Sequence, residues 1–136
     1  MSTDLDRLLA AKYLLLTTFR KDGSAVPTAV WFARDDDGGE GSAGVELLVW
    51  TVTGSGKVKR LRRDGTVTIA ACDVRGKPTG TAIDGQARLL DAQGSQRTRD
   101  LIARRYGLFG RLTMLGSRLR RGPEGTIGIA ITPAAG

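Results

Sequence analysis

The 136-residue sequence contains no histidine and a single cysteine, Cys72. The absence of histidine excludes Ser-His-Asp triads, imidazole acid–base catalysis and histidine metal ligands. With one cysteine, neither an internal disulfide nor a zinc site of the usual kind can form, and we expect no metal site. Any chemistry must use carboxylates, lysine, tyrosine, hydroxyl groups or a bound cofactor, and a cofactor is the natural expectation. The sequence assigns no catalytic residue.

Long hydrophobic runs are also missing. Apolar runs such as Tyr13 to Leu16 are far shorter than the roughly 18 residues of a membrane-spanning helix, so we expect no stable membrane insertion. The acidic N-terminus lacks the apolar region of a signal peptide, and a lone cysteine suits a reducing compartment, which together predict a cytoplasmic protein. Aromatic residues make up only 5% of the chain and are not interleaved with the basic residues. A stacking platform for nucleic acid requires such interleaving, so we expect no nucleic-acid partner.

The net charge of +7 is unevenly distributed. Residues 1–54 contain five basic and eight acidic residues, whereas residues 55–136 contain sixteen basic and six acidic residues. This asymmetry indicates an anionic partner for the second half of the chain. Charge alone leaves nucleic acid, a membrane surface and an anionic cofactor as candidates.

The pattern of apolar residues predicts a mainly β protein. Asp22-Gly23 is a hairpin signal between the first two strands. Six antiparallel strands in so short a chain would curl into a barrel to remove their edges, with short helices packed outside, and we expect residues 1–136 to form one domain. The predicted strands are Tyr13–Arg20, Ala25–Arg34, Val45–Val52, Thr66–Asp73, one that ends near Leu90, and Thr126–Pro133.

Two features near the C-terminus allow more than one interpretation. Gly107 separates two helix candidates, 92–106 and 108–121. The second has an apolar stripe and several arginines, which fits a packing or lid helix and also fits binding to an anionic membrane. The last strand presents a face of small residues that would let another surface approach closely: Thr126, Gly128, Ala130 and Thr132.

The most informative segment is Trp50 to Arg63. It predicts the end of a strand, a Gly/Ser turn and a short helix with five basic residues in the seven positions that begin at Lys57. Cations at a helix N-terminus oppose the helix dipole, so their presence indicates that the helix start binds an anion. Backbone N–H groups, the Ser55 hydroxyl and basic side chains would converge on one phosphate-sized group. A solvated basic helix face is the alternative interpretation.

Three segments together resemble one family. They are residues 12–23, residues 27–32 and residues 50–63, which includes a Thr-x-x-x-Ser-x-Lys element from Thr51 to Lys57. Their order resembles the pyridoxamine 5'-phosphate oxidase-like split barrels, and most closely their deazaflavin branch. The resemblance covers nearly the whole chain. It implies the FMN-binding type of split β-barrel, a homodimer with cofactor sites between the subunits, and a small-molecule substrate.

The resemblance also implies a cofactor site. In that family the Ser and Lys after the third strand hold the cofactor's phosphate, which here are Ser55 and Lys57. The second-strand segment lies along the tricyclic ring, and Trp31 and Trp50 suit either a flat wall for that ring or plain core packing. The implied cofactor-binding residues are Thr28, Val30, Trp31, Trp50, Thr51, Ser55, Lys57, Lys59 and Arg60.

The function that the resemblance implies is hydride transfer between reduced coenzyme F420 and a small organic acceptor. F420 carries a lactyl-phosphate and an oligoglutamate tail, so the additional basic residues around the predicted helix favour it over FMN. Two alternatives stay open at this point. The protein could be an FMN-dependent oxidoreductase of the same fold, or it could carry F420 without catalysing a reaction.

Overall fold

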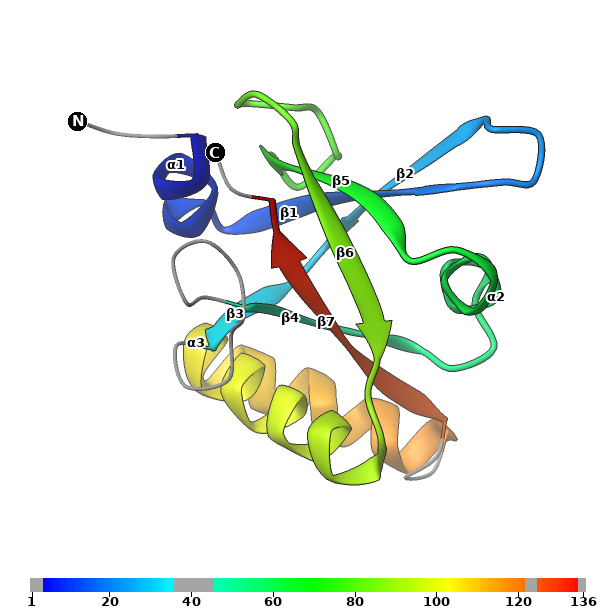
Figure 1. Cartoon of the computed structure of the whole chain (residues 1–136). Coiled ribbons are helices and arrows are strands. Elements are labelled where there is room, and N and C mark those ends of the chain that lie inside the picture. The colour runs from blue at the N-terminus through cyan, green and yellow to red at the C-terminus, as the bar shows by residue number, and fades with distance from the viewer. Residues whose placement is uncertain (1–3, 36–45, 122–124, 135–136) are drawn as a thin grey trace.

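The computed structural model describes residues 4–35, 46–121 and 125–134, and within them it has three helices and seven strands (Figure 1). In chain order the elements are α1 (Asp4–Ala10), β1 (Tyr13–Phe19), β2 (Ala25–Val30), β3 (Phe32–Asp35), β4 (Glu46–Val52), α2 (Gly56–Arg63), β5 (Thr66–Cys72), β6 (Ile83–Leu89), α3 (Ala92–Arg121) and β7 (Thr126–Pro133). The predicted mainly β class is confirmed.

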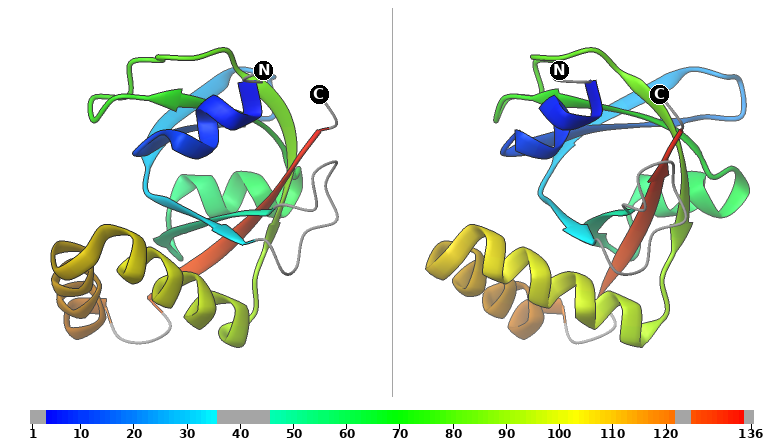
Figure 2. Two further views of the ribbon diagram at one scale, coloured as in Figure 1. Left: turned by 90° about the vertical axis from the view of Figure 1, so that its left-hand side faces the viewer. Right: turned by 60° about the vertical axis from the view of Figure 1, so that its left-hand side comes forward.

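The strands of the described chain form one antiparallel sheet in the order β2-β1-β5-β6-β7-β4-β3. The two edges of the sheet are β2 and β3, yet only Trp31 separates these strands along the chain. The sheet must therefore curl until its edges approach one another at Trp31. Figure 2 shows this curl from two further directions.

The prediction of six strands is wrong by one, because the predicted strand Ala25–Arg34 is divided at Trp31. Before Trp31 the chain pairs with β1, where Val30 lies opposite Leu14, and after it the chain pairs with β4. Val30 and Phe32 still pack on the same main core, so the alternation of side chains continues across the division. What changes at Trp31 is the strand with which the chain pairs, and the local sequence pattern carries no information about that strand.

Alternate residues of the strands form the main hydrophobic core on one face of the curled sheet. Leu8 of α1 and Leu61 of α2 complete it from the two helices. Burial of each large aliphatic side chain stabilises the fold by about 1.5–3 kcal/mol. The strand residues in this core are Leu14, Leu16, Phe32, Leu47, Val49, Val67, Ile69, Ile129 and Ile131.

The helix α3 covers the opposite face of β7 and β4 (Figures 1 and 2). A Cβ atom on Gly128 would lie 2.6 Å from the Thr98 hydroxyl oxygen and 3.1 Å from the Ser95 backbone. The Gly128 N–H donates to the Ser95 hydroxyl at 2.9 Å. The small-residue face of the last strand, expected to suit another surface, is thus packed at Gly128 against a helix of the same chain.

The structure confirms that Gly107 separates two C-terminal helices. The element α3 consists of two helical stretches that meet at Gly107, whose φ of 66° and ψ of −147° are not helical. Of the predicted apolar stripe on 108–121, Leu112 is exposed, and the other side chains lie outside the described ones. No helix in the described ranges combines the length and the apolar character that crossing a membrane takes.

Candidate functional site

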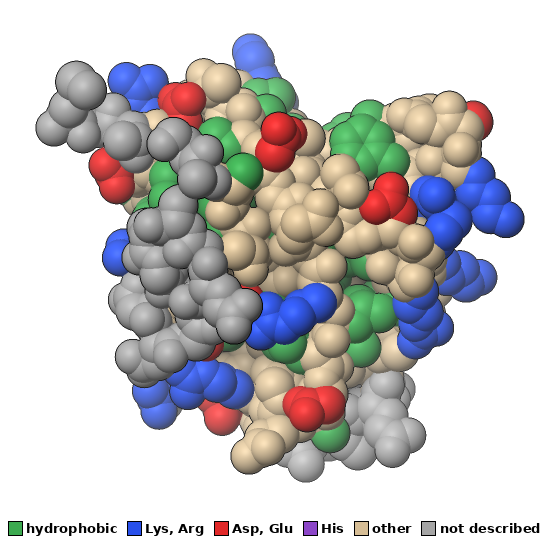
Figure 3. Space-filling view, viewed as in Figure 1, with side chains coloured by type: hydrophobic (Ala, Val, Ile, Leu, Met, Phe, Trp, Pro, Cys, Tyr) green, Lys and Arg blue, Asp and Glu red, His purple; other side chains and the backbone are tan. Residues whose placement is uncertain are grey.

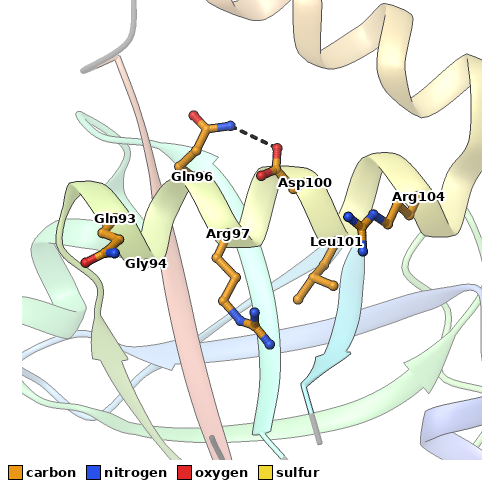
Figure 4. A pocket seen from close by; sticks show the side chains of 7 residues that line it. All are labelled: Gln93, Gly94, Gln96, Arg97, Asp100, Leu101 and Arg104. Carbon is orange, nitrogen blue, oxygen red and sulfur yellow. Dashed lines mark hydrogen bonds between the residues drawn. The ribbon is translucent and has the colours of Figure 1, made fainter. Parts of the chain in front are cut away.

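A cavity of about 580 Å³ lies along α3 and is lined mostly by polar residues of that helix (Figure 4). Two of its three charged residues, Arg97 and Asp100, have partners in the described part of the chain. Arg97 extends toward the sheet and pairs with Asp35 at 3.0 Å, and Gln96 donates to Asp100 at 2.9 Å. None of the residues predicted to bind the cofactor lines this cavity, so it is not the candidate site.

A second cavity, of about 300 Å³, lies where the two sheet edges meet. We call it the ring cavity. Four of the predicted cofactor-binding residues line it, namely Val30, Trp31, Trp50 and Thr51, and the remaining lining residues are Tyr13, Ala29, Val52 and Val74. This lining is apolar and aromatic and contains no charged residue, which suits a flat heterocycle.

The walls of the ring cavity are fixed by α3. The Trp31 ring stacks on the Tyr106 ring with centroids 4.5 Å apart and an interplanar angle of 12°. The Tyr106 hydroxyl donates to the Lys12 carbonyl at 2.6 Å, and the Phe32 N–H donates to that hydroxyl at 3.3 Å. Burial is the largest cause that raises the pKa of Tyr106 above 10.0. Tyr106 therefore orients Trp31, and its hydroxyl stays protonated and donates to the Lys12 carbonyl.

The start of α2 lies directly beside the ring cavity. The Ser55 N–H donates to the Val52 carbonyl at 3.0 Å, which closes a tight turn between the cavity lining and the helix. Ser55 occupies the N-cap, yet its hydroxyl makes no capping hydrogen bond, and that buried oxygen has no partner among the described residues. The first N–H groups of an α-helix have no intrahelical acceptor. This helix start can therefore bind an anion with its backbone and with Ser55 together.

Trp50 contributes a second uncommitted polar atom. Its indole nitrogen is buried and has no hydrogen-bond partner among the described residues. A buried donor without an acceptor costs about 1–3 kcal/mol. A bound heterocycle with a carbonyl or ring nitrogen at this point would recover that cost, so the site fits the ring and the phosphate of a flavin-like cofactor.

Lys57 and Arg60 add positive charge at the same helix start. Lys57 is half-buried, and burial, followed by the neighbouring Arg60 guanidinium, lowers the pKa of Lys57 below its ordinary value of 10.5. A phosphate would favour the charged form of Lys57 by supplying an opposite charge. Lys and Arg side chains gather on the side of the molecule where α2 lies (Figure 3).

Arg60 lies across the first turn of α2. Its Nε donates to the Thr18 hydroxyl at 2.6 Å, and its Nη1 lies 2.7 Å from the position that a Cβ atom on Gly56 would take. A side chain at position 56 would displace the guanidinium. Thr18 is fully buried on β1, so it holds Arg60 from a rigid strand.

The structure brings most of the predicted cofactor-binding residues into two adjacent groups, with Val30, Trp31, Trp50 and Thr51 at the ring cavity and Ser55, Lys57 and Arg60 at the start of α2. Thr28 lies two residues before Val30 on β2 and lines neither the ring cavity nor the cavity on α3. Lys59 is exposed on α2.

Other residues of the site were missed from the sequence. Among them, Val74 lines the ring cavity, and Thr18 orients Arg60. Val74 carried a usable signal in the sequence, since it is an apolar residue inside a polar turn. In the structure its side chain is 65% exposed. Thr18 carried none, because its partner is 42 residues away. Within the described ranges, no three Cys, Asp or Glu side chains come together as a metal site would require.

Comparison with known proteins identifies the fold and the family. Residues 4–133 match the family described as pyridoxamine 5'-phosphate oxidase. No protein with a curated description is similar enough in sequence to count as a match. Solved structures also share the fold, and the three described next have sequence identities too low to indicate a shared function.

The first is a conserved hypothetical protein from Mycobacterium tuberculosis, with 19% identity, a TM-score of 0.67, and coverage of 99% of this chain and 82% of that chain. An F420 reductase has 18% identity, a TM-score of 0.60, and coverage of 99% and 97%. The heme storage protein HutZ from Vibrio cholerae has 14% identity, a TM-score of 0.62, and coverage of 93% and 84%. The family match extends over nearly the whole chain, and the protein therefore belongs to the pyridoxamine 5'-phosphate oxidase family.

Proposed function

We propose that this protein is an F420-dependent oxidoreductase that reduces a small organic acceptor. The observation that carries the proposal is the position of the apolar ring cavity directly beside a helix start with an uncommitted Ser55 hydroxyl and a half-buried Lys57. A cofactor with a flat ring and a phosphate a few bonds away matches this pair of sites. The fold similarity to an F420 reductase is compatible with the proposal.

The phosphate group would bind at the start of α2. Ser55, Lys57 and the first backbone N–H groups would donate to its oxygens, and Arg60, oriented by Thr18, would add a second cation. Lys59 is exposed, so it would meet the oligoglutamate tail beyond the phosphate.

The tricyclic ring would lie in the ring cavity. Trp31, held by Tyr106, would form one wall, and Val30, Trp50 and Thr51 would form the remainder, with Thr28 further along β2. The Trp50 indole N–H would donate to a polar atom of the ring.

When bound, reduced F420 supplies the hydride. The residues of this chain orient the ring and the acceptor and exclude water from between them. The Tyr106 hydroxyl is committed to the Lys12 carbonyl, so it does not donate a proton. Tyr13, the other tyrosine of the chain, lines the ring cavity, which makes it the better candidate for proton donation.

The choice of F420 over FMN rests on charge. FMN has a single phosphate, whereas the tail of F420 adds carboxylates that basic residues beyond the phosphate would attract. Lys59, Arg62 and Arg63 are exposed on α2 and extend the positive surface past Ser55 and Lys57. Heme, which the structurally similar HutZ stores, is less suited to this chain, since the sequence has no histidine to bind its iron.

The same proposal includes the assembly and the location. Residues 1–136 would form one split-barrel domain, and two copies would form a homodimer that closes the ring cavity, whose rim includes the exposed Val74. Cys72 is a buried free thiol, which fits a cytoplasmic protein.

The experiment that tests the proposal is a titration of the apo-protein with F420 and with FMN, followed by fluorescence. Micromolar affinity for F420 with much weaker binding of FMN supports it. Tighter binding of FMN would make the protein a flavin oxidoreductase, and binding of neither would contradict both assignments. Reduced F420 is then mixed with a panel of enones, quinones and nitroaromatic compounds. Tight binding without oxidation by any acceptor would favour a carrier of F420.

A further inference from the structure

A third cavity, of about 480 Å³, has Trp31 in its wall and is lined by no residue of the α2 start. It is lined by Ala10, Lys12, Tyr13, Trp31, Arg105 and Tyr106, and we call it the aromatic cavity. Tyr13 and Trp31 line both this cavity and the ring cavity, so the two cavities meet at these residues. A molecule in the aromatic cavity would therefore lie next to a ring bound in the ring cavity.

The aromatic wall of this cavity is rigid. Trp31 and Tyr106 are stacked, and the Tyr106 hydroxyl is anchored to the backbone at Lys12 and at Phe32. Such a wall presents flat faces and edges to a ligand, and flat conjugated molecules pack on it with little loss of side-chain freedom.

The charges of this cavity all have one sign. Lys12 and Arg105 line it, and none of the lining residues is a carboxylate. The Arg105 guanidinium lies 4.2 Å from the centroid of the Phe32 ring and donates to the Ala11 carbonyl, which fixes its position. Lys12 is exposed and its side chain can reorient toward a ligand. Two cations beside an aromatic wall favour a flat anion over a neutral molecule of the same shape.

We infer that the aromatic cavity is the acceptor site and that it selects flat, conjugated acceptors that carry a carboxylate or a sulfonate. Its role as an acceptor site rests on the proposed function, whereas the anion binding does not. The ring cavity shares Tyr13 and Trp31 with the aromatic cavity and reaches the turn before α2 at Val52. A cofactor with its ring in the ring cavity and its phosphate at α2 would therefore direct its anionic tail away from the aromatic cavity.

The test is a binding experiment on the apo-protein with 2-naphthoate and its neutral analogue 2-naphthamide, followed by quenching of tryptophan fluorescence. We expect 2-naphthoate to bind about ten- to a hundredfold more tightly, as one or two charge-assisted contacts would give. In Lys12→Gln the affinity for 2-naphthoate should fall toward that for 2-naphthamide. The matched control is Lys21→Gln, which removes the same charge from the exposed β1–β2 turn and should change neither affinity.

A second control separates this cavity from the phosphate site. Lys57→Gln should leave 2-naphthoate binding unchanged, because Lys57 does not line the aromatic cavity. Equal affinities for the two naphthalenes, or a loss of 2-naphthoate binding in Lys57→Gln but not in Lys12→Gln, would overturn the inference. If the protein binds 2-naphthoate through Lys12 but binds neither F420 nor FMN, the anion site stands and the proposed function fails.

Discussion

The Nε of Arg60 donates to the hydroxyl of Thr18 at 2.6 Å, which ties the first turns of α2 to the buried end of β1. This contact leaves the two terminal nitrogens of the guanidinium beside Gly56, at the start of the helix. The cation is therefore placed before any ligand arrives, and pre-placed groups lose less entropy on binding.

Thr18→Val should weaken the contribution of the phosphate to binding while preserving the packing of β1. The loss of one hydrogen bond that orients a charged group corresponds to about three- to tenfold in affinity. The measurement is the ratio of affinities for FMN and riboflavin, which differ by the phosphate. Thr18→Ser keeps the hydroxyl and should restore the ratio, and an unchanged ratio in Thr18→Val would exclude an orienting role.

Lys57→Gln should not destabilise the apo-protein. Burial and Arg60 lower the pKa of Lys57, so the folded state holds this charge less readily than the unfolded state does. Between that lowered pKa and 10.5, the unfolded state binds more protons, and the stability of the parent protein rises with pH relative to Lys57→Gln. Urea unfolding of both proteins through the alkaline range measures the difference. Destabilisation of Lys57→Gln at neutral pH would instead show that Lys57 serves the fold.

The same pKa predicts how binding depends on pH. Affinity for a phosphate-bearing cofactor should fall as the pH rises through the lowered pKa of Lys57, since neutral Lys57 no longer attracts the phosphate. Lys57→Arg stays charged over this range and should show no such fall. The titration of the cofactor affects both proteins equally, so it cancels in the ratio of the affinity of the parent protein to that of Lys57→Arg at each pH. A ratio that is independent of pH would mean that Lys57 does not contact the phosphate.

Gly128→Ala should destabilise the protein by about 1–3 kcal/mol, the usual cost of overpacking a core. The added Cβ would lie 2.6 Å from the Thr98 hydroxyl oxygen and would push α3 away from β7. Gly54→Ala is the matched control, because a Cβ there meets nothing within 4 Å. Equal thermal midpoints for the two variants would show that α3 does not pack against β7 as the structure has it.

Much of the fold follows from local patterns in the sequence. The alternating residues of β5 and β7 and the turn at Gly23 are encoded within a few residues, and so is the bend at Gly107. The helix that follows the strand ending at Val52 was also predictable, because both lie within the segment from Trp50 to Arg63. The cofactor-binding roles came from the family resemblance and stay predictions.

The remaining features depend on contacts between distant segments. The division at Trp31 reflects a change of pairing partner, and Thr18 meets Arg60 only after β1 and α2 have packed. Gly65 follows α2 at the place where a glycine commonly ends a helix, but its φ is not positive. It is required because a Cβ there would lie 2.6 Å from the Ala87 carbonyl oxygen. The local sequence does not tell a glycine needed for a positive φ from one needed because another backbone lies close to it.

The central claim is that the start of α2 binds the phosphate of the cofactor. The most direct measurement compares the affinity for F420 with that for the same deazaflavin without its lactyl-phosphate tail, in the parent protein and in Lys57→Gln. We expect the tail to strengthen binding to the parent protein, and Lys57→Gln to remove about ten- to a hundredfold of that gain, as the loss of a charge-assisted hydrogen bond would. The tail-free compound should bind both proteins equally. A gain from the tail that is the same in both proteins would contradict the account.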